Sequence, residues 1–184
     1  MNSKSGTVRY VAFLRGINVG GHHKVPMVML SSEFENLGFT NVKTLLNSGN
    51  VIFDSENIPT KALEELIARN LEKTFGFAIP TIIRNANFIN DLHHESPFRE
   101  IEVTKNIRLY VTFLRIDSHS QLEIPWQSSD GSYKIIEKRD NVILSVLNLS
   151  VSKTTIAMNV LENNFGKDIT TRNWNTIERI ANKI

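Results

Sequence analysis

Cysteine is missing from this chain of 184 residues, and neither sign of charge dominates, with 21 Lys and Arg against 19 Asp and Glu. The lack of cysteine excludes disulfides and metal sites built on thiolates. A formal net charge of +2 is too small to be the global signature of a nucleic-acid-binding protein, so any attraction for anions must be local. A hydrophobic content of 41% is nevertheless enough to build a core.

Long hydrophobic runs and low-complexity tracts are missing as well. No apolar run approaches the roughly 20 residues of a membrane-spanning helix. The N-terminal residues MNSKSGT lead into a strand-like pattern without the apolar core of a signal peptide. We therefore expect a globular cytoplasmic protein with no membrane partner and no strong nucleic-acid signature.

Short sequences recur along the chain in a constant order. YVAFLR at 10–15 returns as YVTFLR at 110–115, and NVIF at 50–53 returns as NVIL at 141–144. Two longer pairs follow the same order: LEKTFGFAIP with LENNFGKDIT, and RNANFI with RNWNTI. Four collinear matches favour a duplicated unit over coincidence.

The first copy alternates between strand and helix patterns. Gly38 and Gly76 follow the two longer helical patterns, in the position where glycine ends a helix. NSGN separates two strand patterns and is typical of a hairpin turn. The expected elements are a strand at 8–14, a helix at 27–37, strands at 42–46 and 51–53, a helix at 60–75, a strand at 79–83 and a short helix at 87–94.

This order of elements is that of the split βαβ, or ferredoxin-like, unit. We predict an α+β protein made by tandem duplication of that unit, each copy with an extra closing helix. The predicted domains are a first subdomain at 8–94, a linker at 95–106 and a second subdomain at 107–184. The strand at 8–14 carries apolar side chains on both faces, which predicts that both faces are covered.

The segment RGINVGGHHK, residues 15–24, has no counterpart in the second copy. It is not a Walker A loop, because His22 stands where that motif requires lysine, and it lacks the GxGxxG spacing. Its glycines can direct successive backbone N–H groups toward an anion, and Arg15 and Lys24 add positive charge. The alternative is a glycine-rich crossover into a helix that starts at Pro26.

Two further stretches carry polar groups with two interpretations each. Ser48 and Asn50 lie in the NSGN turn, so they either shape the turn or reach a ligand beside it. Ser152 is predicted to cap the long helix of the second copy. Together with Lys153 it also suits a phosphate or carboxylate at a helix N-terminus.

The stretch TTRNWNTIERI near the C-terminus is the second dense polar patch. Arg172 has the planar donor geometry that binds carboxylate or phosphate, and Asn173 stands beside it. Asn175 and Glu178 fit an approximate capping box. Because Arg84–Asn85 occupies the equivalent place in the first copy, part of this patch is expected to be structural.

The five histidines and the catalytic motifs lead to no assignment. His22–His23 and His93–His94 lack the helical spacing of metal ligands, so we expect solvated histidines and no metal site. No nucleophile and base stand in a known arrangement, and neither a catalytic residue nor a cofactor is identified.

Three motifs taken together resemble a known family. LRGINVGGHHKVPM, VKTLLNSGNVIF and TTRNWNTI are similar to the bacterial family catalogued as domain of unknown function 1697, and the resemblance extends from Tyr10 to about Ile180. It implies two α+β subdomains and no known activity. His22 and His23 depart from the family pattern, which carries onto Arg15–Gly21, Lys24–Pro26, Ser48–Asn50, Ser152, Lys153, Thr171–Trp174 and Thr176.

Our leading hypothesis is a small anionic ligand, a nucleotide or phosphorylated metabolite, bound between the two subdomains. One alternative is a protein-interaction or homo-oligomeric module that uses the sheet faces and the Trp174 helix. Another is a metal-assisted phosphoryl or nucleotidyl transfer enzyme. The candidate ligand-binding residues are Arg15, Gly16, Asn18, Gly20, Gly21, Lys24, Ser48, Asn50, Ser152, Lys153, Arg172, Asn173 and Asn175.

Overall fold

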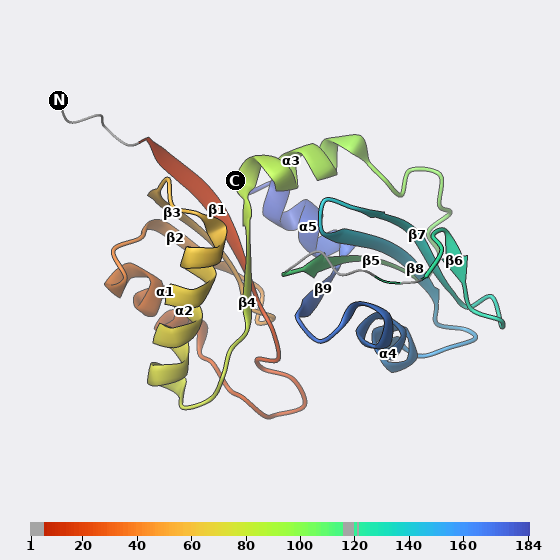
Figure 1. Cartoon of the computed structure of the whole chain (residues 1–184), viewed down its shortest axis with the longest axis horizontal. Coiled ribbons are helices and arrows are strands. Elements are labelled where there is room, and N and C mark those ends of the chain that lie inside the picture. Colours follow the sequence, from red (N-terminus) through yellow and green to blue (C-terminus); the bar gives the residue numbers. More distant parts are fainter. Residues whose placement is uncertain (1–5, 116–119, 121) are drawn as a thin grey trace. The chain divides into compact units, whose positions relative to one another are not determined.

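The structure is a computed structural model that describes residues 6–115, 120 and 122–184 (Figure 1). His119 lies outside the described residues. The chain divides into two compact units: one holds the described residues up to Asp91 together with Ile180–Ile184, and the other holds Leu92–Arg179. Each unit contains one antiparallel sheet and helices, so the predicted mixed α+β class is confirmed.

The first sheet has the strand order β2-β3-β1-β4. Every element expected in this part of the chain is present, and strand β4 begins two residues later than predicted because Pro80 cannot donate a ladder hydrogen bond. The elements are β1 (Thr7–Leu14), α1 (Met27–Asn36), β2 (Thr40–Leu45), β3 (Asn50–Glu56), α2 (Thr60–Phe75), β4 (Thr81–Asn85) and α3 (Ala86–Glu95).

Strand β1 is buried on both faces, as its sequence predicts. Tyr10, Ala12 and Leu14 belong to a core that includes buried residues of α1 and α2. Val11 and Phe13 alternate with them and are both 0% exposed.

The second sheet has the strand order β6-β7-β8-β5-β9. The first unit has the glycine-rich loop and a helix between its first two strands. The described residues at the same place in the second unit include the two-residue strand β6, in agreement with the lack of a counterpart to residues 15–24 in the second copy of the sequence. The elements are β5 (Ile107–Leu114), β6 (Trp126–Gln127), β7 (Tyr133–Arg139), β8 (Val142–Asn148), α4 (Thr154–Phe165), β9 (Ile169–Asn173) and α5 (Trp174–Ala181).

The strand pairs β1–β4 and β5–β9 have the same register, whereas β5–β8 is shifted by one residue relative to β1–β3, because Tyr10 lies opposite Phe53 and Tyr110 lies opposite Ser145. In the first sheet Tyr10 lies opposite Asn85, and in the second Tyr110 lies opposite Asn173. Four strands of the second sheet, β7-β8-β5-β9, repeat the order β2-β3-β1-β4 of the first. The repeated sequences therefore lie on strands in matching positions of the two sheets, with a shift of one residue in the pairing of NVIL.

Two predicted helix caps are wrong. The N-cap position of α4 is Lys153, no side chain caps this helix, and the buried Ser152 hydroxyl has no hydrogen-bond partner among the described residues. Helix α5 begins at Trp174, and the Asn175 N–H donates to Asn173 Oδ1 at 3.1 Å. Asn173 therefore caps this helix, because the helix starts two residues earlier than an N-cap at Asn175 requires.

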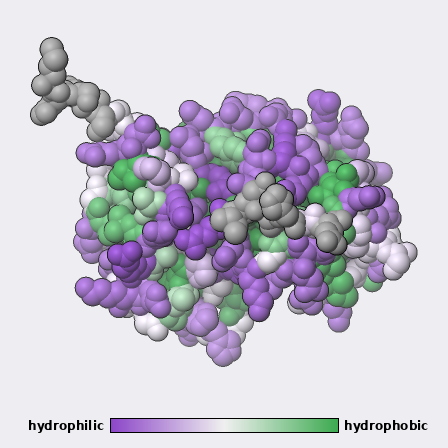
Figure 2. Space-filling view, in the orientation of Figure 1, coloured by the Kyte–Doolittle hydropathy of each residue, from purple (hydrophilic) through white to green (hydrophobic). Residues whose placement is uncertain are grey.

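Hydrophilic residues cover most of the face drawn in Figure 2, and hydrophobic residues form small separate patches on it. Large apolar side chains that are more than half exposed include Val19, Val28 and Val103. Within the described part of the chain, no helix is long and apolar enough to cross a membrane.

A bidentate ion pair links β1 to β3. Arg9 donates from Nε to Asp54 Oδ1 at 2.7 Å and from Nη2 to Oδ2 at 2.9 Å, and Asn41 Nδ2 donates to Oδ2 at 2.8 Å. The Asp54 side chain is only 9% exposed. The hydrogen bond from Arg9 is the main cause that lowers the pKa of Asp54 below its ordinary value of 3.8.

We expect D54N to reduce the loss of stability in acid. A carboxylate whose pKa is depressed by folding stabilises the protein above its unfolded-state pKa, and this contribution disappears as the pH falls through the folded-state value. Melting temperatures measured from about pH 6 to about pH 2 should fall more steeply for the native chain than for the variant. Parallel curves would contradict a stabilising role for the pair.

Candidate functional site: the glycine loop

The glycine loop, residues 15–24, connects β1 to α1 (Figure 1) and folds back on itself as a small hairpin. The Asn18 N–H donates to the His23 carbonyl at 3.0 Å, and the His22 N–H donates to the Val19 carbonyl at 3.1 Å. The two central residues, Gly20 and Gly21, have φ of +59° and +80°. Tight turns with two positive φ angles favour glycine at both positions, which explains the GG pair.

The Asn18 side chain holds the loop in place. Its Nδ2 donates to the Val25 carbonyl at 3.0 Å and to the Asn47 carbonyl at 2.9 Å. Its Oδ1 accepts the Val25 N–H at 2.8 Å. Three hydrogen bonds therefore fix the exit of the loop and join it to the turn between β2 and β3, a structural role that the candidate set did not assign to this asparagine.

The turn between β2 and β3 packs directly against the start of the loop. The Leu14 N–H donates to the Gly49 carbonyl at 2.8 Å. A Cβ on Gly49 would lie 2.7 Å from Ile17 Cδ1 and 2.8 Å from Leu14 Cβ, so only glycine fits there. The buried Asn50 donates from Nδ2 to the Leu45 carbonyl and to Ser48 Oγ, both at 3.0 Å. The NSGN motif thus shapes the turn and places it beside the loop.

His23 has a packing role that the sequence did not suggest. Its ring stacks on Phe77 with centroids 4.3 Å apart and planes 14° apart. Its Nδ1 lies 3.2 Å from the Gly16 carbonyl oxygen. Within the described residues no group of three or more histidine or carboxylate side chains is placed to hold a metal ion.

A surface hollow of about 430 Å³ lies beside the loop, lined by Asn18, Gly21, Lys24, Val25, Pro26, Met27 and Asn47. No carboxylate occurs at positions 10–32 or 40–53, whereas Arg15, Lys24 and Lys43 carry positive charge there. Lys24 is exposed and forms no ion pair with a described residue. Among the described residues, Lys24 is therefore the charged residue that lines the hollow, and no carboxylate lines it.

The candidates near the C-terminus belong to the second unit and have different surroundings. Arg172 is 7% exposed, and its Nη1 donates to Thr170 Oγ1 at 2.8 Å and to the Thr171 carbonyl at 2.9 Å. Burial lowers the pKa of Arg172 to about 10. Lys153 is exposed at the start of α4, and Asn175 is exposed on α5.

Arg84 and Asn85 repeat part of this arrangement in the first unit. Arg84 Nη1 donates to the Ile83 carbonyl at 2.8 Å, and Asn85 Oδ1 accepts the Asn87 N–H at 2.8 Å. In both units, therefore, the asparagine ties the last strand to the closing helix, and the arginine donates to groups of its own strand. This agrees with the expectation that part of the patch is structural.

The family described as protein of unknown function (DUF1697) matches residues 8–137, which include the glycine loop and the NSGN turn. The chain belongs to the DUF1697 family. Among solved structures, this DUF1697 protein is similar to one described as conserved bacterial protein SP0830 from Streptococcus pneumoniae. The two are 25% identical with a TM-score of 0.66, and the match covers 96% of this chain and 98% of that one. No curated protein matches.

Proposed function

We propose that this DUF1697 protein binds a small anionic ligand, a nucleotide or a phosphorylated metabolite, at the glycine loop. The carrying observation is the exposed Gly20–Gly21 turn beside Lys24, in a stretch of chain without carboxylates. Among the described residues, none accepts a hydrogen bond from the Gly20 or Gly21 N–H. Backbone N–H groups in left-handed turns, together with an ammonium group, are suited to phosphate oxygens.

The hydrogen bonds of Asn18 support the proposal because they fix the loop before any ligand arrives. A pre-ordered loop loses less conformational entropy on binding, so more of the contact energy appears as affinity. The apolar side chains of Val25 and Met27 line the same hollow. They offer a surface for the carbon skeleton or base that carries the phosphate.

We propose, as the sequence suggests, that candidate residues of the second unit also contact the ligand. These residues are Ser152, Lys153, Arg172, Asn173 and Asn175. Lys153 is the strongest of these candidates because its charged group is exposed, whereas the Arg172 guanidinium is buried and Asn173 caps α5. K153A separates the two parts. Weakened ligand binding in this variant would support the extended site, and unchanged binding would restrict the proposal to the glycine loop.

We also propose that the two units arose by tandem duplication of a ferredoxin-like unit. Three observations support this: the collinear repeated sequences, the matching strand orders, and the Arg-Asn pair that has the same hydrogen bonds at Asn85 and Asn173. The glycine loop then belongs to one copy alone, which is how a new site is added to a repeated scaffold.

A thermal-shift screen against inorganic phosphate, nucleotides and sugar phosphates tests binding. A ligand present at about 100 times its Kd adds about 2.7 kcal/mol of stability. We expect at least one phosphorylated compound to raise the melting temperature of the native chain, and K24A to reduce that shift. K61A is the matched control, because Lys61 is an exposed lysine on α2. No shift with any compound, together with a concentration-dependent dimer, would favour the interaction module instead.

A further inference from the structure

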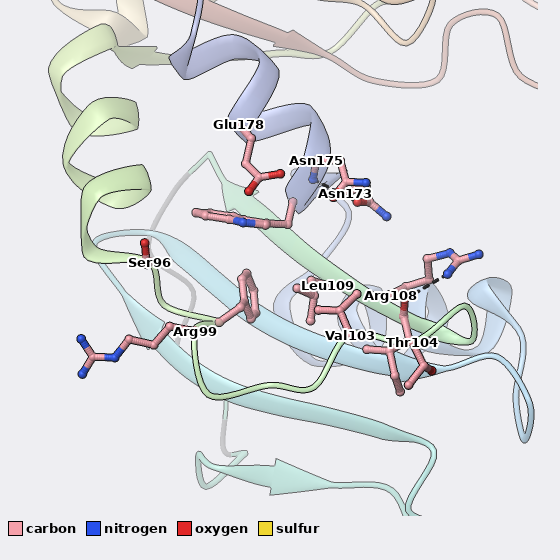
Figure 3. A pocket seen from close by; sticks show the side chains of 12 residues that line it. Ser96, Arg99, Val103, Thr104, Arg108, Leu109, Asn173, Asn175 and Glu178 are labelled. Atoms are coloured by element: carbon pink, nitrogen blue, oxygen red, sulfur yellow. Dashed lines mark hydrogen bonds between the residues drawn. The ribbon is translucent and has the colours of Figure 1, made fainter.

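The second unit contains its own hollow, of about 520 Å³, between α5, the start of β5 and the segment that follows α3. In Figure 3, Glu178 and Asn175 lie on one side of it, and Val103, Thr104 and Leu109 lie on the other. Sites for small molecules in proteins have volumes of roughly 300–1,000 Å³. This hollow therefore has the size of a ligand site, and Asn173 and Asn175 are the two candidate residues of the second unit that line it.

Aromatic and apolar side chains form the floor of this hollow. The rings of Phe98 and Trp174 meet edge to face with centroids 5.3 Å apart, and His93 stacks on Trp174 at 6.1 Å. Leu109 is buried, whereas Val103 at the rim is 62% exposed. A ligand with an apolar body would cover Val103 and remove its surface from water.

Two polar groups of the hollow have no protein partner in the described part of the chain. Trp174 is only 8% exposed, yet no described residue accepts a hydrogen bond from its indole N–H. The Glu178 carboxylate likewise forms no hydrogen bond or ion pair with a described residue. The Glu178 carboxylate is therefore available to a cationic group of a ligand, whereas the indole N–H of Trp174 is not among the buried side-chain atoms that lack a partner.

The charged side chains around the hollow determine which sign of charge a ligand should have. The Arg99 side chain points away from the other labelled side chains in Figure 3. Arg108 donates from Nη1 to the carbonyls of Lys105 and Ile107, so its guanidinium is held against the backbone. The Glu178 carboxylate is therefore the charged group that α5 contributes to the hollow. The faces of the aromatic rings of the hollow also attract cations.

We propose that this hollow binds an amine with an aromatic or bulky apolar body. The ammonium pairs with the Glu178 carboxylate, and the apolar body lies over the floor formed by Phe98, Leu109 and Trp174. Such an ammonium belongs either to a free small amine or to the N-terminal residue of a peptide. The chemistry is the same in the two cases, and the experiment separates them.

The fluorescence of Trp174 reports binding directly. The chain has only two tryptophans, so W126F leaves Trp174 as the one indole. Phenethylamine and the peptide Phe-Gly-Gly are the two probes, and hydrocinnamate, which replaces the amine by a carboxylate, is the control ligand. We expect a saturable change in emission with at least one of the amines and none with hydrocinnamate. A response to phenethylamine alone identifies a site for free amines, and a response to the peptide alone identifies a site for N-termini.

A substitution at Glu178 tests the assigned ion pair. E178Q should weaken amine binding by about tenfold or more, the loss expected for one charge-assisted hydrogen bond. E123Q, which neutralises an exposed carboxylate outside the hollow, should leave binding unchanged. Isothermal titration of the native chain repeats the measurement without W126F.

Three results would overturn this proposal: no saturable response to either amine, equal binding of hydrocinnamate, or equal affinity in E178Q. None of these measurements involves phosphate or the glycine loop. Failure here would therefore leave the anion site at the glycine loop untouched, and failure of that site would leave this proposal untouched.

Discussion

Alanine at position 49 is expected to lower the free energy of unfolding by about 2–5 kcal/mol. The new Cβ would lie 2.7 Å from Ile17 Cδ1 and 2.8 Å from Leu14 Cβ, both of them buried side chains that cannot move into solvent. Overpacking of this kind costs about 1–3 kcal/mol. Gly49 also has φ of +74°, a conformation that costs a residue with a side chain about 1–2 kcal/mol more.

The matched control for this substitution is G76A. Gly76 ends α2 with φ of +78°, but no atom lies within 4 Å of the place where its Cβ would be. G76A therefore measures the cost of the backbone conformation alone, about 1 kcal/mol. Urea unfolding of both variants separates the two contributions. Equal losses would show that the turn and the loop are not tightly packed against each other.

Replacing Asn18 by alanine is expected to cost about 2–4 kcal/mol and to weaken binding of any ligand at the glycine loop. The change removes all three hydrogen bonds of the side chain and leaves the N–H of the buried Val25 without its acceptor. A buried donor that loses its partner costs about 1–3 kcal/mol. The remaining loss comes from the other two bonds and from alanine at φ of +55°.

N18G distinguishes the hydrogen bonds from the backbone conformation. Glycine accepts the positive φ without strain, so N18G should retain most of the loss seen in N18A if the hydrogen bonds dominate. N57A, at an exposed asparagine, should change stability by less than about 0.5 kcal/mol. If N18A is no more destabilising than N57A, Asn18 does not hold the loop.

Much of the fold can be predicted from patterns that a few residues enforce. Gly38 and Gly76 end α1 and α2 with φ of +86° and +78°, as their positions after helical patterns indicate. The apolar residues on both faces of β1 predict a strand that is buried on both sides, and Val11 and Phe13 are fully buried. These signals are local or periodic, so they can be recognised in the sequence without knowledge of the tertiary contacts.

The features that escaped prediction depend on contacts between distant residues or on a shift of one or two positions in a helix start. The stacking of His23 on Phe77 joins residues more than fifty positions apart, and no local pattern encodes it. The predicted caps at Ser152 and Asn175 are wrong because α4 starts one residue later than a cap at Ser152 requires, and α5 starts two residues earlier than a cap at Asn175 requires.

Within the candidate site, residue type alone did not distinguish residues that could bind a ligand from residues that stabilise the loop. Asn18, Ser48 and Asn50 are polar residues in glycine-rich turns, which suits either a ligand contact or a structural hydrogen bond. The structure assigns hydrogen bonds within the protein to all three. Lys24 and the Gly20–Gly21 turn are exposed and are not held by such side-chain hydrogen bonds, and the proposed function rests on them.

The most direct test of that proposal is a titration of the isotope-labelled protein with inorganic phosphate, followed by the amide resonances of the glycine loop. We predict that the Gly20 and Gly21 amide signals shift saturably, because their N–H groups would donate to the bound anion. K24A should weaken this response, and K61A should leave it intact. Amide signals of the loop that stay unchanged up to saturating phosphate, or that shift equally in K24A, would contradict the assignment of an anion site to this loop.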